Sequence, residues 1–201
     1  MISHDAVVDA IRRVTTRAST PSSDHDLNPG MVPPPGRALR PASVLVGIEA
    51  ADGGPRVILT KRASHLLHHP GQIAFPGGKA EKSDAGVEAT ALREAGEEIG
   101  LPRDQVELIG VLPTHETVTG FMVTPVLGLI RPGFAPVLQR SEVDEVFAVP
   151  LAHVMDPSRY RVERRIWRGE WRSYYAVPWG PYYIWGATAR ILRTLAERMS
   201  A

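Results

Sequence analysis

Three glutamates near the middle of the chain have the spacing of a cation-binding site. On a helix, Glu94, Glu97 and Glu98 stand at positions i, i+3 and i+4, which places three carboxylates on one face. Gly100 predicts that this helix ends there, and acids in a last turn cost about 0.3–1 kcal/mol each at exposed sites. A divalent cation would offset this cost, and carboxylate oxygens are the ligands that Mg²⁺ prefers. The alternative is a solvated acidic face on which Arg93 pairs with Glu97 one turn later.

The string REAGEEIGL at residues 93–101 resembles the second half of the Nudix box, the loop–helix–loop signature G-x5-E-x7-R-E-U-x-E-E-x-G-U, in which U is apolar. The first half differs, because Gly78 lies one position early and Asp84 is the acid nearest to the expected glutamate. The loop is therefore one residue longer than the general pattern, and Asp84 is expected to take the place of that glutamate.

The segment before the box, ILTKRASHLLHHPGQIAFPGG at residues 58–78, resembles the additional signature of the coenzyme A pyrophosphatase branch, roughly L-x-x-R-S-x-x-L-R-x-H-x-G-Q-[IV]-x-F-P-G-G. Two positions depart from it, because Ala63 replaces the serine and Leu67 replaces the second arginine. The resemblance implies that the substrate belongs to the coenzyme A class, and three matching polar positions are expected to bind it: Arg62, His69 and Gln72.

The chemistry that the resemblance implies is hydrolysis of a pyrophosphate linking two organic groups. Water must attack a phosphorus atom surrounded by negative oxygens, so cations must offset that charge and a base must orient or deprotonate the water. By resemblance, Glu94 and Glu98 are the principal metal ligands, and Glu97 is a third ligand or a base acting through metal-bound water. A backbone carbonyl of Gly77 or Gly78 is expected to complete the shell around Mg²⁺ or Mn²⁺.

Two further acids and one arginine belong to the expected catalytic site. Arg93 is expected to hold a glutamate in place through an ion pair. Some Nudix enzymes carry the base on a loop after the box, which makes Glu142 and Glu145 candidates for that role. The alternative for Glu145 is an exposed strand position.

The segments TGFMVTPVLGLI at residues 119–130 and IWGATARIL at residues 184–192 resemble the same branch. The resemblance implies that Thr117, Thr119 and Phe121 line the substrate pocket, while Gly120 is equally consistent with a structural turn.

Composition excludes several classes of protein. The chain has 201 residues, of which 43% are hydrophobic and 22% charged, so it suits one ordinary globular domain with a substantial core. A net charge of +1 gives no attraction to nucleic acid or to a membrane surface, and the absence of cysteine excludes disulfides and thiolate metal sites. No apolar run reaches the roughly 20 residues of a membrane span, and the start lacks the features of a signal peptide. We therefore expect a cytoplasmic protein.

Two other clusters have competing interpretations. His65, His68 and His69 invite a zinc hypothesis, although their adjacent placement lacks a recognised zinc spacing. The stretch RRIWRGEWRSYY at residues 164–175 mixes arginines with aromatic residues, a composition used to bind single-stranded nucleic acid. The alternative is a hairpin with apolar residues on one side and arginines in solvent, and a homodimer contact is a third interpretation.

The periodicity of the chain predicts the elements that position these residues. Helical spacing is present at residues 5–17, 85–99 and 184–199, and strands are expected at 42–49, 56–61, 106–113, 122–130 and 143–149, with a hairpin at 161–177. We divide the chain into an N-terminal helix and Pro-rich arm (1–41) and a hydrolase domain (42–201). Residues 21–36 are too polar to bury and form either a mobile arm or a packed surface crossing. The fold class is α/β, and the resemblance implies an α/β/α sandwich with a mixed sheet between helices.

Two rival functions remain. One is a Nudix hydrolase acting on another nucleoside-diphosphate-linked substrate, such as ADP-ribose, a nucleotide sugar, a dinucleotide or a capped RNA, which the replacement at Leu67 keeps open. The other is a non-catalytic Nudix module that binds a nucleotide or a partner.

Overall fold

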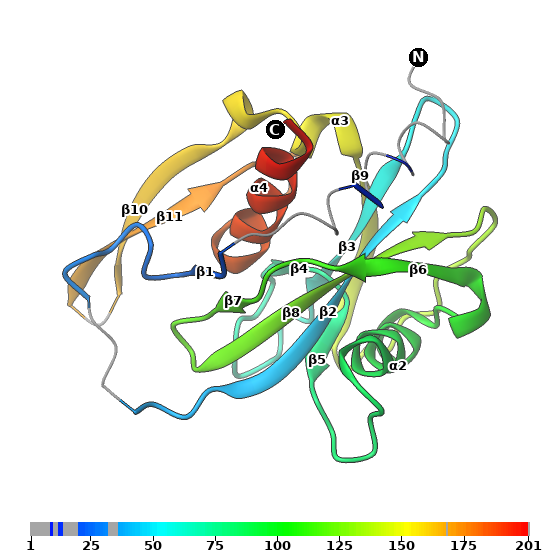
Figure 1. The fold of residues 1–201 in the computed structure, drawn as a ribbon, viewed down its shortest axis with the longest axis horizontal. Coiled ribbons are helices and arrows are strands. Elements are labelled where there is room, and N and C mark those ends of the chain that lie inside the picture. Colours follow the sequence, from blue (N-terminus) through cyan, green and yellow to red (C-terminus); the bar gives the residue numbers. More distant parts are fainter. Residues whose placement is uncertain (1–8, 10–11, 14–19, 32–35, 168, 201) are drawn as a thin grey trace.

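The structure of the chain is a computed structural model that describes residues 9, 12–13, 20–31, 36–167 and 169–200 (Figure 1). The helix expected at residues 5–17 lies outside the described residues except for three of its positions. In the part of the chain that is described, no helix is long and apolar enough to cross a membrane.

A mixed sheet forms the centre of the fold. Its longest pair is β2 (Arg40–Glu49) and β8 (Phe121–Ile130), which run parallel in an unbroken register of ten residues. Both strands are rich in apolar residues and buried on both faces, as is typical of central strands covered by helices. Six further strands of the sheet are β3 (Arg56–Arg62), β4 (Ile73–Ala74), β5 (Gly77–Lys79), β6 (Val106–Val111), β7 (His115–Glu116) and β9 (Val143–Pro150).

Two helices cover the two faces of the sheet (Figure 1). Helix α2 (Val87–Ile99) packs its alanines and Ile99 against Leu45 and Val126, whereas α4 (Gly186–Ser200) packs Leu192 and Leu195 against the opposite face. Neighbouring residues in a strand point to opposite faces, so Leu45 contacts the α2 side while Val46 contacts the α4 side. The expected sandwich is confirmed.

Glycine ends the box helix as predicted. Gly100 adopts the left-handed conformation, with φ of 68°, and its N–H donates to carbonyls of the last turn. The helix begins two residues later than the sequence indicated, at Val87, because Gly86 is extended and Asp84 belongs to the preceding turn.

The smaller elements lie beyond the sheet. They are the helix α3 (Leu151–Val154) and the 3-10 turns Arg103–Gln105 and Pro157–Arg159. The expected hairpin is confirmed as β10 (Arg161–Trp167) and β11 (Glu170–Ala176). Its arginines stack on tryptophans of the same chain: Arg172 lies over Trp167 at 4.4 Å, and Arg165 lies over Trp185 at 5.0 Å.

The N-terminal segment joins the sheet, which the sequence did not predict. Strand β1 (Ser22–Ser23) pairs in parallel with His115 and Glu116 of β7. Ser22 and Asn28 are buried, so the expectation that this segment is too polar to bury is wrong for these residues. The Asn28 side chain accepts the Ser173 N–H at 2.8 Å and donates to the Ser173 carbonyl at 2.9 Å. In its described part the segment is the packed crossing rather than a mobile arm.

Candidate functional site

Arg93 is the centre of an ionic network on the box helix. Its guanidinium donates to both carboxylate oxygens of Asp84, at 2.9 and 3.1 Å, and to the Lys79 carbonyl at 3.0 Å. The same group lies 3.0 Å from Glu97 and 3.1 Å from Glu94. Its hydrogen bonds hold the pKa of Asp84 well below the usual range. The structure therefore places Asp84 against Arg93 and lets one arginine orient three carboxylates.

Glu94 and Glu98 point from the helix toward β5, which begins with two glycines. Glu98 is only 3% exposed and accepts the Gly77 N–H at 3.1 Å. Burial raises the pKa of Glu98 to about 7 and also raises the pKa of Glu94. A Cβ at position 78 would lie 2.5 Å from the Glu94 carboxylate, so only glycine permits this close approach.

This pair of carboxylates fits a bound divalent cation. Among the described residues, Glu98 has no cationic partner within ion-pair distance, and burial, together with the charges of Glu94 and Glu142, disfavours its charge. Glu97, the third expected ligand, has a 59% exposed side chain and is turned toward Arg93. No three Asp, Glu or His side chains of the described chain converge closely enough to enclose a metal by themselves. That arrangement suits Mg²⁺, which keeps several waters and shares its shell with substrate phosphates.

The two candidate bases lie in different places. Glu142 is exposed at the start of β9, and its charge raises the pKa of both Glu94 and Glu98. Glu145 instead accepts a hydrogen bond from the Tyr182 hydroxyl, and the Tyr182 ring stacks on Phe147 with centroids 3.5 Å apart. Phe147 packs in the core beneath α4, and Glu145, two residues earlier on the same strand, points to the same face of the sheet. Glu142 therefore lies within electrostatic reach of the box glutamates, whereas Glu145 points to the opposite face of the sheet.

The residues of the additional signature are gathered in one turn between β3 and β4. Arg62 and Gln72 pair through their backbones, since the Arg62 N–H donates to the Gln72 carbonyl at 3.0 Å. The Gln72 side chain hydrogen-bonds to His69, although burial lowers the His69 pKa overall. Arg62 acts electrostatically on both Glu98 and His69, and its Nε is buried without a hydrogen-bond partner in the described structure. The turn thus presents a donor without a partner beside the box glutamates.

The structure bears on two further features of this segment, the departure from the signature at Leu67 and the histidine cluster. Leu67 is 95% exposed at the outside of the turn. His65, His68 and His69 do not form a metal-ligand group within the described chain, so the zinc hypothesis has no support in the geometry.

The loop before β8 carries Thr119 and Phe121, the other two expected substrate contacts. The Thr117 hydroxyl lies 3.1 Å from the Thr119 hydroxyl and accepts the Phe121 N–H at 2.9 Å. Gly120 is left-handed, with φ of 89°, so it makes a structural turn. Strand β2 links this loop to the box, because Arg40 pairs with Phe121 while Ser43, on the same strand, pairs with Gly78.

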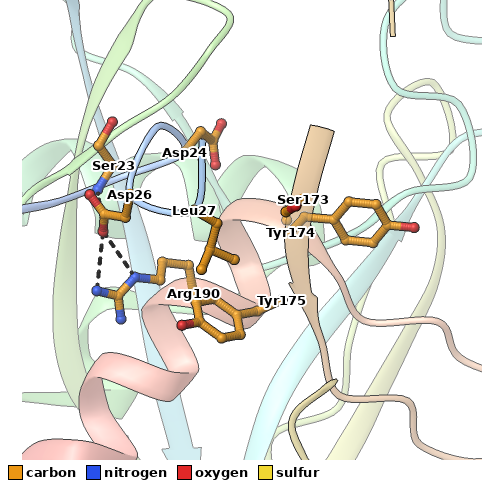
Figure 2. Close-up of a pocket in the computed structure, with 9 residues that line it drawn as sticks. Ser23, Asp24, Asp26, Leu27, Ser173, Tyr174, Tyr175 and Arg190 are labelled. Carbon is orange, nitrogen blue, oxygen red and sulfur yellow. Dashed lines mark hydrogen bonds and ion pairs between the residues drawn. The ribbon is translucent and has the colours of Figure 1, made fainter. Parts of the chain in front are cut away.

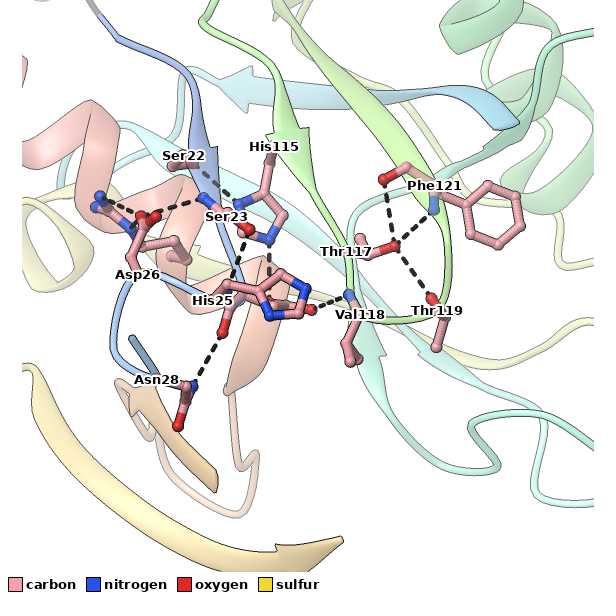
Figure 3. Close-up of polar contacts among 12 residues, drawn as sticks. Ser22, Ser23, His25, Asp26, Asn28, His115, Thr117, Val118, Thr119 and Phe121 are labelled. Carbon is pink, nitrogen blue, oxygen red and sulfur yellow. Dashed lines mark hydrogen bonds and ion pairs between the residues drawn. The ribbon is translucent and has the colours of Figure 1, made fainter. Parts of the chain in front are cut away.

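A buried polar network beside this loop was not predicted. His115 has no solvent exposure, and its ring nitrogens lie 2.9 Å from the Ser22 hydroxyl and 3.1 Å from an Asp24 oxygen (Figure 3). The other Asp24 oxygen accepts the Val118 N–H at 2.9 Å. Burial opposes ionisation of Asp24, but its pKa is lowered overall by the bonds from His115 and Val118. No local signal in the sequence links residues 91 positions apart.

A small hollow lies between the N-terminal segment and α4. It is lined by Asp26, Leu27, Tyr175 and Arg190, among others, and holds none of the predicted catalytic residues (Figure 2). The Asp26 carboxylate pairs there with Arg190 at 3.2 Å. This contact joins the segment to α4.

Comparisons with known proteins agree with the resemblance of this chain to the Nudix box. The NUDIX domain family model matches residues 39–168. An uncharacterized Nudix hydrolase, NudL, from Enterobacter sp. (strain 638) is 45% identical over 161 residues, covering 78% of this chain and 81% of that protein. The same figures hold for NudL from Salmonella newport (strain SL254). The crystal structure of the Nudix hydrolase RenU from M. smegmatis is 25% identical, covers 58% of this chain and 74% of its own, and superposes with a TM-score of 0.49.

Proposed function

Because this chain belongs to the Nudix hydrolase family, it is a hydrolase of phosphoanhydrides, and we propose that its substrate is coenzyme A or a coenzyme A derivative. The products from coenzyme A are 3′,5′-ADP and 4′-phosphopantetheine, and an acyl derivative gives acyl-phosphopantetheine. The observation that carries this proposal is the turn of Arg62, His69 and Gln72, whose arginine acts on the Glu98 carboxylate.

The proposed mechanism uses a divalent cation and the carboxylates of the box. Glu94 and Glu98 would hold the ion, with Glu97 and the Gly78 carbonyl as further ligands. Mg²⁺ or Mn²⁺ supplies positive charge against the pyrophosphate oxygens when it is bound. Glu142, which lies within electrostatic reach of both buried glutamates, orients the water and accepts its proton.

Arg62 has the chemistry needed to bind the substrate. A guanidinium offers several N–H donors in a fixed plane, and the Arg62 Nε is buried without a partner among the described residues. A buried donor without a partner is costly, so a phosphate oxygen in this place would remove that cost. His69 and Gln72 on the same turn would contact the same end of the substrate.

Product analysis tests this assignment. The purified protein is incubated with Mg²⁺ or Mn²⁺ and, separately, coenzyme A, ADP-ribose and a diadenosine polyphosphate, and the products are separated by chromatography. Release of 3′,5′-ADP from coenzyme A, with little product from the other two, supports the proposal. Turnover of the other substrates alone would overturn the substrate assignment and favour the alternative kept open by Leu67, while leaving the chemistry intact.

We also propose that the protein forms a homodimer through the edge of β10 that pairs with no other strand in the described part of the chain. Val162 and Ile166 are exposed on this strand, and Ile166 lies opposite the exposed Trp171. An antiparallel pair of β10 strands from two copies, centred on Arg164, would place each Val162 opposite an Ile166. The same register would place each Glu163 opposite an Arg165, which is a favourable cross-strand charge pair.

A further inference from the structure

The loop at residues 117–120 is hydrogen-bonded by two arginines, one before β2 and one at its first position. The Arg37 guanidinium donates to the carbonyls of Thr117 at 2.7 Å and of Val118 at 3.3 Å. Arg40 donates from its side chain to the Thr119 carbonyl at 3.2 Å and from its backbone to the Gly120 carbonyl at 2.9 Å. The carbonyls of this loop are therefore fixed by two arginines that precede or begin β2.

Asp24 fixes the loop from the other side. Its carboxylate accepts the Val118 N–H at 2.9 Å and also contacts His115 at 3.1 Å (Figure 3). His115 is anchored in turn by the Ser22 hydroxyl, and β1 beside it is hydrogen-bonded to β7. Because His115 is fully buried, its ring nitrogens depend on Ser22 and Asp24 for their hydrogen bonds.

The same aspartate reaches the substrate-binding turn electrostatically. The charge of Asp24 is one of the charges that act on the His69 ring, although burial dominates the environment of that ring. Asp24 is therefore hydrogen-bonded to the loop that carries Thr119 and lies within electrostatic reach of His69.

We propose that Asp24 is a positioning residue for the substrate pocket, acting through the Val118 N–H on the loop that carries Thr119 and Phe121. The N-terminal segment then contributes to substrate binding by the hydrolase. This inference rests on the proposed function for its kinetic consequence, but its structural consequence can be measured without a substrate.

The test compares Asp24→Ala with a matched control, Asp26→Ala. Asp26 lies two residues away, accepts the Ser23 N–H and pairs with Arg190 of α4 (Figure 2). Its hydrogen bonds in the described structure go to Ser23 and Arg190, whereas the Val118 N–H donates to Asp24. If docking of the segment alone matters, the two substitutions have the same effect. If Asp24 positions the loop, only Asp24→Ala accelerates hydrogen exchange of the Val118 amide, measured by NMR.

The kinetic measurement uses whichever substrate the product analysis identifies. We expect Asp24→Ala to raise KM about tenfold while kcat stays within about threefold, as the loss of a charge-assisted hydrogen bond to a binding loop predicts. Asp24→Asn, which keeps an oxygen for the Val118 N–H, should restore most of the wild-type KM. Asp26→Ala should change neither KM nor the exchange of Val118.

Arg37→Ala provides a second variant in case Asp24→Ala does not fold. It loosens the same loop from the opposite side and should also raise KM with little change in kcat. An unchanged KM in both variants, or equal effects of Asp24→Ala and Asp26→Ala, would overturn the proposal. If no substrate in the panel is cleaved, the proposed function fails, whereas the exchange of Val118 still decides whether Asp24 holds the loop.

Discussion

The Gly77 N–H donates to the Glu98 carboxylate at 3.1 Å, and this bond joins the loop that opens the box to the last turn of the helix that closes it. A buried carboxylate with one backbone donor and no cationic partner among the described residues is poorly compensated. Burial accordingly raises the pKa of Glu98 to about 7. Its neighbour Glu94 is raised in pKa for the same reason, so both groups favour a bound cation.

Glu98→Gln should nearly abolish hydrolysis without unfolding the protein. The amide keeps the shape of the side chain and an acceptor for Gly77 but loses the negative charge that holds a cation. We expect kcat/KM to fall about 10³-fold, since metal catalysis contributes several kcal/mol. Glu88→Gln, in the first turn of the same helix, is the matched control. A Glu98→Gln enzyme that keeps most of its activity would rule out the metal assignment.

The stability of the metal-free protein should fall as the pH rises. The folded Glu98 carboxyl has a pKa of about 7 instead of 4.5, so the folded state binds its proton more tightly than the unfolded chain does. This contribution is fully present below the unfolded pKa and is lost as the pH rises through the folded pKa. Thermal melts in a chelator should therefore show Tm decreasing between pH 5 and pH 7.5. Mg²⁺ or Mn²⁺ should restore Tm at the higher pH and have little effect at the lower.

The Glu98→Gln variant checks the origin of that pH dependence. It lacks the titrating carboxyl, so its Tm should change less between the two pH values and should not respond to the cation. An equal pH dependence in the variant and in the native protein would place the titration elsewhere.

Asp84→Ala tests whether Asp84 takes the role of the box glutamate that this chain lacks. Without it, Arg93 loses two acceptor oxygens at 2.9 and 3.1 Å and is free to change its contacts with Glu94 and Glu97. We expect kcat to fall between about tenfold and hundredfold through misplaced carboxylates, with a lower Tm. The neighbouring Glu81→Ala removes a charge from the same turn but no contact with Arg93, and should be close to native in a steady-state assay.

Local patterns were enough to predict the parts of the site that lie close in the sequence. The end of the box helix at Ile99 and the Arg93–Glu97 pair follow from helical spacing and from Gly100. The covering of the sheet by helices follows from the apolar runs of β2 and β8. Glu145 and Phe147 are two residues apart on one strand, so the sequence predicts that their side chains point to the same face of the sheet. The sequence does not show whether that face is the one covered by the box helix.

Non-local pairing could not be predicted in the same way. Asp24 and His115 are 91 residues apart, and nothing in the polarity of residues 21–36 shows that a carboxylate there will meet a buried imidazole. Polar residues are usually exposed, and Ser22 and Asn28 are buried only because each finds specific hydrogen-bond partners on β7 or β11. Such compensation depends on the assembled fold.

Ile166→Lys should convert the proposed dimer to a monomer. The substitution places a charge in an edge-to-edge contact, while Ile166 is exposed in the single chain and its loss should leave the fold unchanged. Sedimentation velocity should show at least a tenfold weaker association. Val137→Lys, at another exposed apolar position, is the control. A native protein that stays monomeric at all concentrations would refute the dimer directly.

Charge reversal provides a sharper check of the register. Glu163→Arg and Arg165→Glu should each weaken the dimer, and the double variant should restore it, because the expected cross-strand pair is re-formed with exchanged signs. Failure of the double variant to recover, with each single variant folded, would exclude this register.

Substitutions of Arg62 separate its two proposed roles. Arg62→Lys keeps a positive charge near Glu98 but loses the planar set of donors, so KM for the substrate should rise about tenfold while the affinity for Mn²⁺ stays near that of the native protein. Arg62→Gln loses both the positive charge and the planar set of donors. Because the Arg62 charge lowers the pKa of Glu98, its removal should raise that pKa further and weaken Mn²⁺ binding at pH 7.

Calorimetric titration with Mn²⁺, beside steady-state kinetics, distinguishes the two roles of Arg62. Equal Mn²⁺ affinities in the two variants would show that Arg62 does not act on the cation site, and an unchanged KM in both would remove it from the substrate pocket.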